Sequence, residues 1–138
     1  MNTYILPRSP SALRAPKVED VNAGSKSIPM RVTTLSERKT AEAARRKRAA
    51  DHAVREFDEY ARKHGGRFVI FGSYATDTMR FDSDLDVLID FPAERTGDAW
   101  RFVEDVCAKL GVPLDVHDAR TTKAGFVERV HASGLVLS

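Results

Sequence analysis

The sequence predicts an α+β protein: a small mixed β-sheet with helices packed on one side of it. Three observations predict this class. Short apolar runs of strand length alternate along the chain with longer segments whose apolar residues recur every three or four positions. Glycine or proline ends most of these segments. The resulting order is helix, strand, short helix, strand, helix, strand, helix, followed by a short edge strand.

Length and composition place the chain among soluble globular proteins. Its 138 residues suit one domain with a modest core, and 42% hydrophobic and 30% charged residues are ordinary for that class. The single cysteine, Cys107, falls in an apolar helical pattern and is predicted to be a core residue; one cysteine agrees with a reducing compartment. No apolar run approaches the roughly 20 residues of a membrane span, and no secretory signal is recognisable, so a cytoplasmic protein is expected.

The N-terminal segment differs in composition from the rest. Residues 1–33 hold four of the six prolines, and their apolar residues follow neither a helical nor a strand period. They are predicted to be a flexible extension preceding a domain of residues 34–138. Charge is also uneven: residues 1–66 carry 14 Lys and Arg against 8 Asp and Glu, whereas residues 67–138 carry 8 against 12.

A long helix is predicted over residues 34–64. Thr34 and Glu37 have the spacing of a capping box, and Gly65 follows the last periodic residue. A cluster of Lys and Arg occupies residues 38–48, and a solvated helix face is the favoured interpretation. The alternative is a docking face for RNA or a partner protein. The apolar stripe of this helix consists of Ala50, Ala53, Val54, Phe57, Ala61 and His64.

A strand and a turn follow the long helix. Arg67–Phe71 is a short apolar run of buried-strand type. Gly72 permits a tight turn, and Ser73 is predicted to open a short helix through about Met79. Backbone N–H groups at such a turn, together with the Ser73 hydroxyl, suit a phosphate group.

Two carboxylates open the next predicted strand, Leu85–Phe91. Asp84 and Asp86 are two residues apart and therefore project from the same face, whereas the opposite face is apolar. Carboxylates held this close repel each other, and a divalent cation is the usual compensation. The simpler alternative is a polar strand entry without a metal.

The remaining segments complete the predicted sheet. Pro92 ends the second strand, and a helix is expected over about Gly97–Leu110. A third strand, Leu114–His117, precedes a helix over about Lys123–Ala132, and Leu135–Leu137 could close the sheet as an edge strand.

A third carboxylate, Asp115, has the strand parity to join Asp84 and Asp86 if its strand lies beside theirs on the same core. Three carboxylates suit Mg²⁺ or Mn²⁺, and two such ions could support in-line phosphoryl displacement. Asp90 shares their face but lies too far along the strand to ligate. His117 has the same parity and is interpreted as a surface group.

Gly72-Ser73, ten residues, then Asp84-Leu85-Asp86 and the later Asp115 together resemble the signature of the DNA polymerase β-like nucleotidyltransferase superfamily. The minimal (MNT) members, often paired with HEPN-domain proteins, are the most similar, over about residues 36–138. The resemblance implies that Asp84, Asp86 and Asp115 are catalytic and metal-binding, and that Gly72, Ser73 and Ser83 contact the nucleotide. Thr76 and Asp77 stand where many minimal members have Arg and Gly.

The resemblance also implies a reaction and partners. A nucleoside monophosphate, AMP from ATP, would be transferred with Mg²⁺ or Mn²⁺ to a hydroxyl acceptor, a tyrosine of a cognate HEPN toxin. The alternatives are a toxin that acts on a tRNA end, using the basic helix, and a non-catalytic antitoxin that acts by binding alone. Whether the chain forms a homo-oligomer is left open by the sequence.

Overall fold

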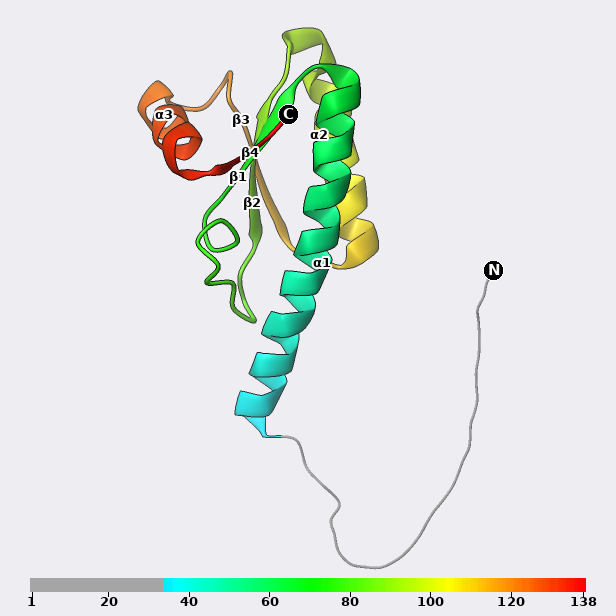
Figure 1. The fold of residues 1–138 in the computed structure, drawn as a ribbon, viewed down its shortest axis with the longest axis vertical. Helices are drawn as coiled ribbons and strands as arrows, with labels where there is room; N and C mark the ends of the chain where they lie inside the picture. The colour runs from blue at the N-terminus through cyan, green and yellow to red at the C-terminus, as the bar shows by residue number, and fades with distance from the viewer. Residues whose placement is uncertain (1–33) are drawn as a thin grey trace, which may run out of the picture. The chain divides into compact units, whose positions relative to one another are not determined.

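The computed structural model describes residues 34–138, of which Leu35–Ser138 form one compact unit (Figure 1). The prediction of a flexible extension falls on residues 1–33, outside the described part. The α+β class is confirmed, because a four-stranded mixed sheet is combined with three helices. The elements are α1 (Leu35–His64), β1 (Arg67–Phe71), β2 (Leu85–Asp90), α2 (Ala93–Leu110), β3 (Leu114–Asp118), α3 (Ala124–Ser133) and β4 (Leu135–Leu137).

The sheet has the strand order β3-β2-β1-β4. β1 runs antiparallel to both β2 and β4, whereas β2 and β3 are parallel. A parallel pair needs a crossover connection, and α2 supplies it. The registers bring Phe71 opposite Asp86 and Asp86 opposite Asp115. Three segments that are distant in the sequence therefore meet at one end of the sheet.

The helices lie on both faces of the sheet. α1 and α2 cover one face, as predicted (Figure 1). Phe68, Ile70 and Val87 are fully buried on this face. The expectation that all helices share this face is wrong for α3, drawn in orange and red on the opposite side. The physical reason is that both faces of the central strands are apolar: Val69 and Leu88 point away from α1, and the α3 residue Val130 buries them.

Only the second half of α1 enters the core. Its 30 residues correspond to a helix about 45 Å long, and the first half extends past the end of the sheet (Figure 1). Gly65 ends the helix in the left-handed conformation, with φ +71° and its N–H donated to the Ala61 carbonyl at 3.0 Å. The buried residues of α1 are Ala50, Ala53, Val54, Phe57 and Ala61.

The second helix begins one turn earlier than predicted, at Ala93 instead of Gly97. Pro92 is its N-cap residue, and the Thr96 hydroxyl donates back to the Pro92 carbonyl at 3.1 Å. Gly97 therefore lies inside the helix. Cys107 is buried in the core as predicted, and burial raises the pKa of its thiol to about 11. Within residues 34–138, the structure contains no helix of the length and hydrophobicity that a membrane span requires.

Candidate functional site

The candidate site lies where β1 ends and β2 and β3 begin. In the parallel pair, Asp86 is the register partner of Asp115, and side chains of such partners project from the same face. The structure thus places Asp115 beside Asp86, in the arrangement that strand parity predicted. Asp84 immediately precedes β2, two residues before Asp86. All three carboxylates lie at the end of the sheet where the connection Gly72–Ser83 links β1 to β2.

The charges of Asp84 and Asp115 both act on Asp86. The pKa of Asp86 is raised to about 6, first by burial, then by the charges of Asp115 and Asp84, and then by a hydrogen bond with Asp115. The nearby His117 acts in the opposite direction. Negative charge at Asp86 is therefore costly in the folded protein unless a cation approaches.

The donor set is chemically suited to a divalent cation, although it is not a closed cage. Within residues 34–138, no three His, Cys, Asp or Glu side chains are arranged to hold one ion between them. Mg²⁺ is usually held by one or two carboxylates together with water and substrate phosphates, so an all-protein cage is not required. Asp86 and Asp115, with Asp84 beside them, are oxygen donors of the preferred type. These residues fit such an ion.

Gly72 permits the close approach of Asp86 to the β1 end. Its φ of +74° is in the left-handed region, which favours glycine. A Cβ atom at this position would also overlap with the Oδ2 and Cγ atoms of Asp86. Any side chain at residue 72 would therefore displace a carboxylate of the site.

The segment after Gly72 is a single helical turn, so the prediction of a short helix over residues 73–79 is wrong. The Thr78 N–H donates to the Ser73 carbonyl at 2.8 Å, and the Asp77 N–H donates to the Tyr74 carbonyl at 3.2 Å. Asp77 has a φ of +57°, which stops the helix. These two bonds and the left-handed residue form a Schellman-type ending, usually made by glycine.

The structure also explains the two departures from the minimal nucleotidyltransferase pattern. Asp77 occupies the left-handed position where many members have glycine, and aspartate is one of the few other residues that tolerate this conformation. The Thr76 hydroxyl bonds to the Thr78 hydroxyl at 2.7 Å and stays within the turn. The backbone shape is therefore kept at residue 77, whereas the positive charge of an arginine at residue 76 is not replaced there.

We expect residue 77 to be sensitive to side-chain shape. Asp77→Val should lower the free energy of unfolding by about 1–2 kcal/mol, because a β-branched residue is strained at positive φ. Asp77→Gly should leave it unchanged or raise it by up to about 1 kcal/mol. Urea unfolding measures both. Asp82→Val, at an exposed residue without positive φ, is the matched control and should change stability by less than about 0.5 kcal/mol.

The two predicted serines differ in their availability for a nucleotide. Within the described residues, neither the Ser73 hydroxyl nor the backbone N–H groups of Ser73, Tyr74 and Ala75 have a hydrogen-bond partner. Consecutive free N–H groups at a turn attract anions. By contrast, the Ser83 hydroxyl accepts a bond from the Arg80 N–H at 2.8 Å and closes a turn.

His117 belongs to this region, although sequence reasoning left it out. Its Nε2 lies 3.4 Å from the Asp115 Oδ2, and its ring packs near Phe71 and Phe126, with centroids 5.8 and 5.7 Å apart. The sequence feature that could have indicated its place is its spacing, because His117 is two residues from Asp115 on one strand and projects from the same face. Asp90 was expected to be too far away, and it binds Arg67 and His131 instead.

Half of the Lys and Arg residues in the basic segment of α1 are paired with carboxylates of the same helix. Glu42 accepts bonds from Arg45 at 2.8 Å and Arg46 at 2.6 Å, and these bonds lower the pKa of Glu42 to about 2. Lys47 lies 3.3 Å from Asp51. Three of the six Lys and Arg of residues 38–48 therefore already have carboxylate partners, which favours a structural role for these three over a free surface for RNA.

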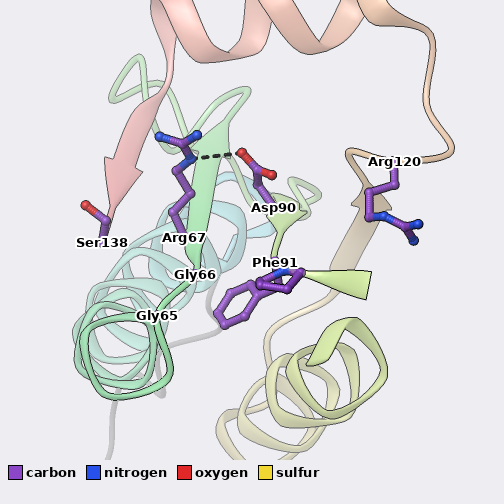
Figure 2. Close-up of a pocket in the computed structure, with 8 residues that line it drawn as sticks. Gly65, Gly66, Arg67, Asp90, Phe91, Arg120 and Ser138 are labelled. Atoms are coloured by element: carbon purple, nitrogen blue, oxygen red, sulfur yellow. Dashed lines mark hydrogen bonds and ion pairs between the residues drawn. The ribbon is translucent and has the colours of Figure 1, made fainter. Parts of the chain in front are cut away.

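A pocket lies elsewhere among the described residues, at the opposite end of the strands (Figure 2). It has a volume of about 510 Å³ and contains the Arg67–Asp90 ion pair, whose nitrogen–oxygen distance is 2.8 Å. Asp90 is four residues beyond Asp86 in β2, or about 13 Å along the strand. The pocket is therefore separate from the carboxylates. Its lining residues are Gly65, Gly66, Arg67, Asp90, Phe91, Pro92, Arg120 and Ser138.

Comparison with known families agrees with this geometry. The family model described as "Nucleotidyltransferase domain" matches residues 51–135, which is more than half of the chain. The match contains every carboxylate of the site and begins inside α1. Neither a curated protein nor a solved structure matches the chain significantly.

Proposed function

Because the chain belongs to the nucleotidyltransferase domain family of the polymerase β-like superfamily, we propose that it transfers AMP from ATP to a hydroxyl group, with a divalent cation held by Asp84, Asp86 and Asp115. The observation that carries this proposal is the pairing of Asp86 with Asp115 across β2 and β3. Asp84 lies beside this pair, and the raised pKa of Asp86 indicates that the three charges need a counter-ion.

The turn after β1 would hold the leaving part of the nucleotide. The Ser73 hydroxyl and the free N–H groups of Ser73, Tyr74 and Ala75 would donate to the outer phosphates. In the reaction, the acceptor oxygen forms a bond to the α-phosphorus while the bond to the bridging oxygen breaks, and pyrophosphate leaves. The bound cation would neutralise the phosphate charge and lower the pKa of the attacking hydroxyl. Asp115, an exposed residue of the edge strand β3, would orient that hydroxyl.

The acceptor that we propose is a tyrosine of a HEPN-domain toxin, which makes the chain an antitoxin of the minimal (MNT) type. Its support is the set formed by Gly72-Ser73, Asp84-Leu85-Asp86 and Asp115, now placed at one end of the sheet. A tRNA end is the competing acceptor. The internal pairing of Arg45, Arg46 and Lys47 counts against it, because phosphate binding would require these cations to leave their carboxylates.

A labelling experiment tests this proposal. The full chain is incubated with Mg²⁺ and α-labelled ATP, and in parallel with each of the other three nucleotides, together with either a candidate HEPN-domain protein or total tRNA. Label should appear on the HEPN protein and be lost when its tyrosines are replaced by phenylalanine. Label on tRNA alone would overturn the proposed acceptor. The absence of label with all four nucleotides would overturn the transfer itself and favour an antitoxin that acts by binding.

A further inference from the structure

We propose that Arg46 and the Asp51–Tyr74 pair are positioning residues for nucleotidyl transfer, which fix both ends of the connection that carries Ser73 and Asp84. This inference rests on the proposed function. Arg46 and Asp51 lie outside the candidate site, and Tyr74 contributes only its backbone N–H group to it. Each acts through a neighbour whose place in the site has been described.

Arg46 fixes the end of the connection that leads to the carboxylates. Its Nη1 donates to the Ser83 carbonyl at 2.9 Å, directly before Asp84. Its Nε donates to Glu42 at 2.6 Å, so the planar guanidinium is held from two sides. Only 18% of its side chain is exposed. The arginine is therefore committed to this carbonyl and is not free for an external anion.

Asp51 and Tyr74 fix the other end. The Tyr74 hydroxyl donates to the Asp51 Oδ1 at 2.6 Å, and Tyr74 directly follows Ser73. Burial and this bond raise the pKa of Tyr74 well above its usual range, so the phenol keeps its proton. Lys47 donates to the same Asp51 oxygen at 3.3 Å and lies 5.5 Å from the centre of the Tyr74 ring. The turn with the free N–H groups is thus tied to α1.

The two contacts that hold the connection, from Arg46 and from Asp51, start within two turns of each other on α1. Arg46 and Asp51 are separated by five residues, or about 7.5 Å along α1. Beside them, the Arg45 Nη2 donates to the Gly111 carbonyl at 2.9 Å, in the loop that leads to β3 and Asp115. One rigid helix therefore contacts every connection that enters the site. A shift of α1 would move the phosphate turn relative to the carboxylates.

Part of this arrangement lies outside the residues that the family model matches. The matched residues begin at Asp51, so Glu42 and Arg46 precede them on the same continuous helix, whereas Asp51 and Tyr74 fall inside the match. Positioning errors near 1 Å can reduce catalysis by about 10²-fold, which sets the size of the expected effect.

The test compares steady-state transfer by the full chain carrying Arg46→Gln, Arg46→Lys or Tyr74→Phe. We expect Arg46→Gln and Tyr74→Phe to lower kcat by about 10- to 100-fold, with KM for ATP changed less than about threefold. Arg46→Lys should recover part of kcat, because lysine can donate one of the two bonds. The double variant Asp51→Asn/Tyr74→Phe should lose little more than Tyr74→Phe alone, since the two residues share one interaction.

Three controls separate positioning from loss of stability. Arg48→Gln alters an exposed arginine without a described partner, Tyr60→Phe removes a hydroxyl without a described hydrogen bond, and Val103→Ala destabilises the core away from the site. All three should keep the wild-type kcat at a temperature where each variant is folded. If Val103→Ala lowers kcat as much as Tyr74→Phe at equal stability, or if Arg46→Gln and Tyr74→Phe retain the wild-type kcat, the positioning role is wrong. An inactive wild-type chain would instead overturn the proposed function.

Discussion

Replacing Asp86 with asparagine is expected to lower kcat for nucleotidyl transfer by about 10³-fold while making the folded protein more stable. The loss of activity follows from removing a charged ligand at the centre of the carboxylate group. The gain in stability follows from the pKa of Asp86, which is raised to about 6 in the folded protein. A carboxyl whose pKa is raised in the folded protein lowers the free energy of unfolding as the pH rises from about 4 to about 6. Asparagine does not ionise and has no such effect.

The expected gain at pH 7.5 is about 1–2 kcal/mol, after allowing for solvent screening of a partly exposed group. Thermal unfolding with and without Mg²⁺ measures it. The wild-type melting temperature should rise with Mg²⁺, whereas that of Asp86→Asn should start higher and respond less. Asp105→Asn, at an exposed position of α2, is the matched control and should change neither activity nor stability. A destabilised Asp86→Asn variant would contradict the charge repulsion inferred for this site.

Gly72→Ala is expected to lower kcat by about 10²-fold. The methyl group would occupy the space of the Asp86 carboxylate, and the left-handed φ of +74° would add about 1–2 kcal/mol of backbone strain. Activity and urea unfolding together measure both effects. Because the carboxylate must move, the loss of activity should exceed what the fraction of unfolded protein explains.

Gly97→Ala provides the control for this substitution. Gly97 is exposed within α2, and an added Cβ would meet only the Arg101 Nη1, at 3.9 Å. Alanine should stabilise the helix by about 0.5–1 kcal/mol and leave kcat unchanged. If Gly72→Ala behaves in the same way, the close packing of residue 72 against Asp86 is not needed for transfer.

The sequence predicted those parts of the molecule that depend on period and parity. Alternation along the strands was enough to place Asp115 beside Asp86, because a shift of one residue would have buried the carboxylates in the core. The length of α1 followed from its apolar stripe and from Gly65. Long periodic segments ended by glycine carry this information in adjacent residues, so no knowledge of the tertiary structure was required.

Contacts between distant segments were not predictable in this way. The side of the sheet on which α3 packs depends on Val69 and Leu88. Their strands are apolar on both faces, so the sequence did not show which face α3 would cover. The bond from Arg46 to Ser83 joins residues 37 positions apart, and the charge pattern of α1 indicated a solvated face or a docking face, but not this contact. The left-handed conformation of residue 77 was not predicted, because the residue is aspartate and not glycine, the residue typical of that conformation.

The strand order also determines how much chain must be ordered to complete the carboxylate group. β1 and β2 are adjacent and antiparallel, so the pairing of Phe71 with Asp86 closes a loop of modest length. The pairing of Asp86 with Asp115 spans 29 residues, with α2 as the crossover between the two strands, so it closes a longer loop. Asp84 and Asp86 are thus brought to the phosphate turn by a local hairpin, and Asp115 joins them through the contact of greater sequence separation. The part of the electrostatic cost that comes from Asp115 therefore arises only when the parallel half of the sheet is assembled.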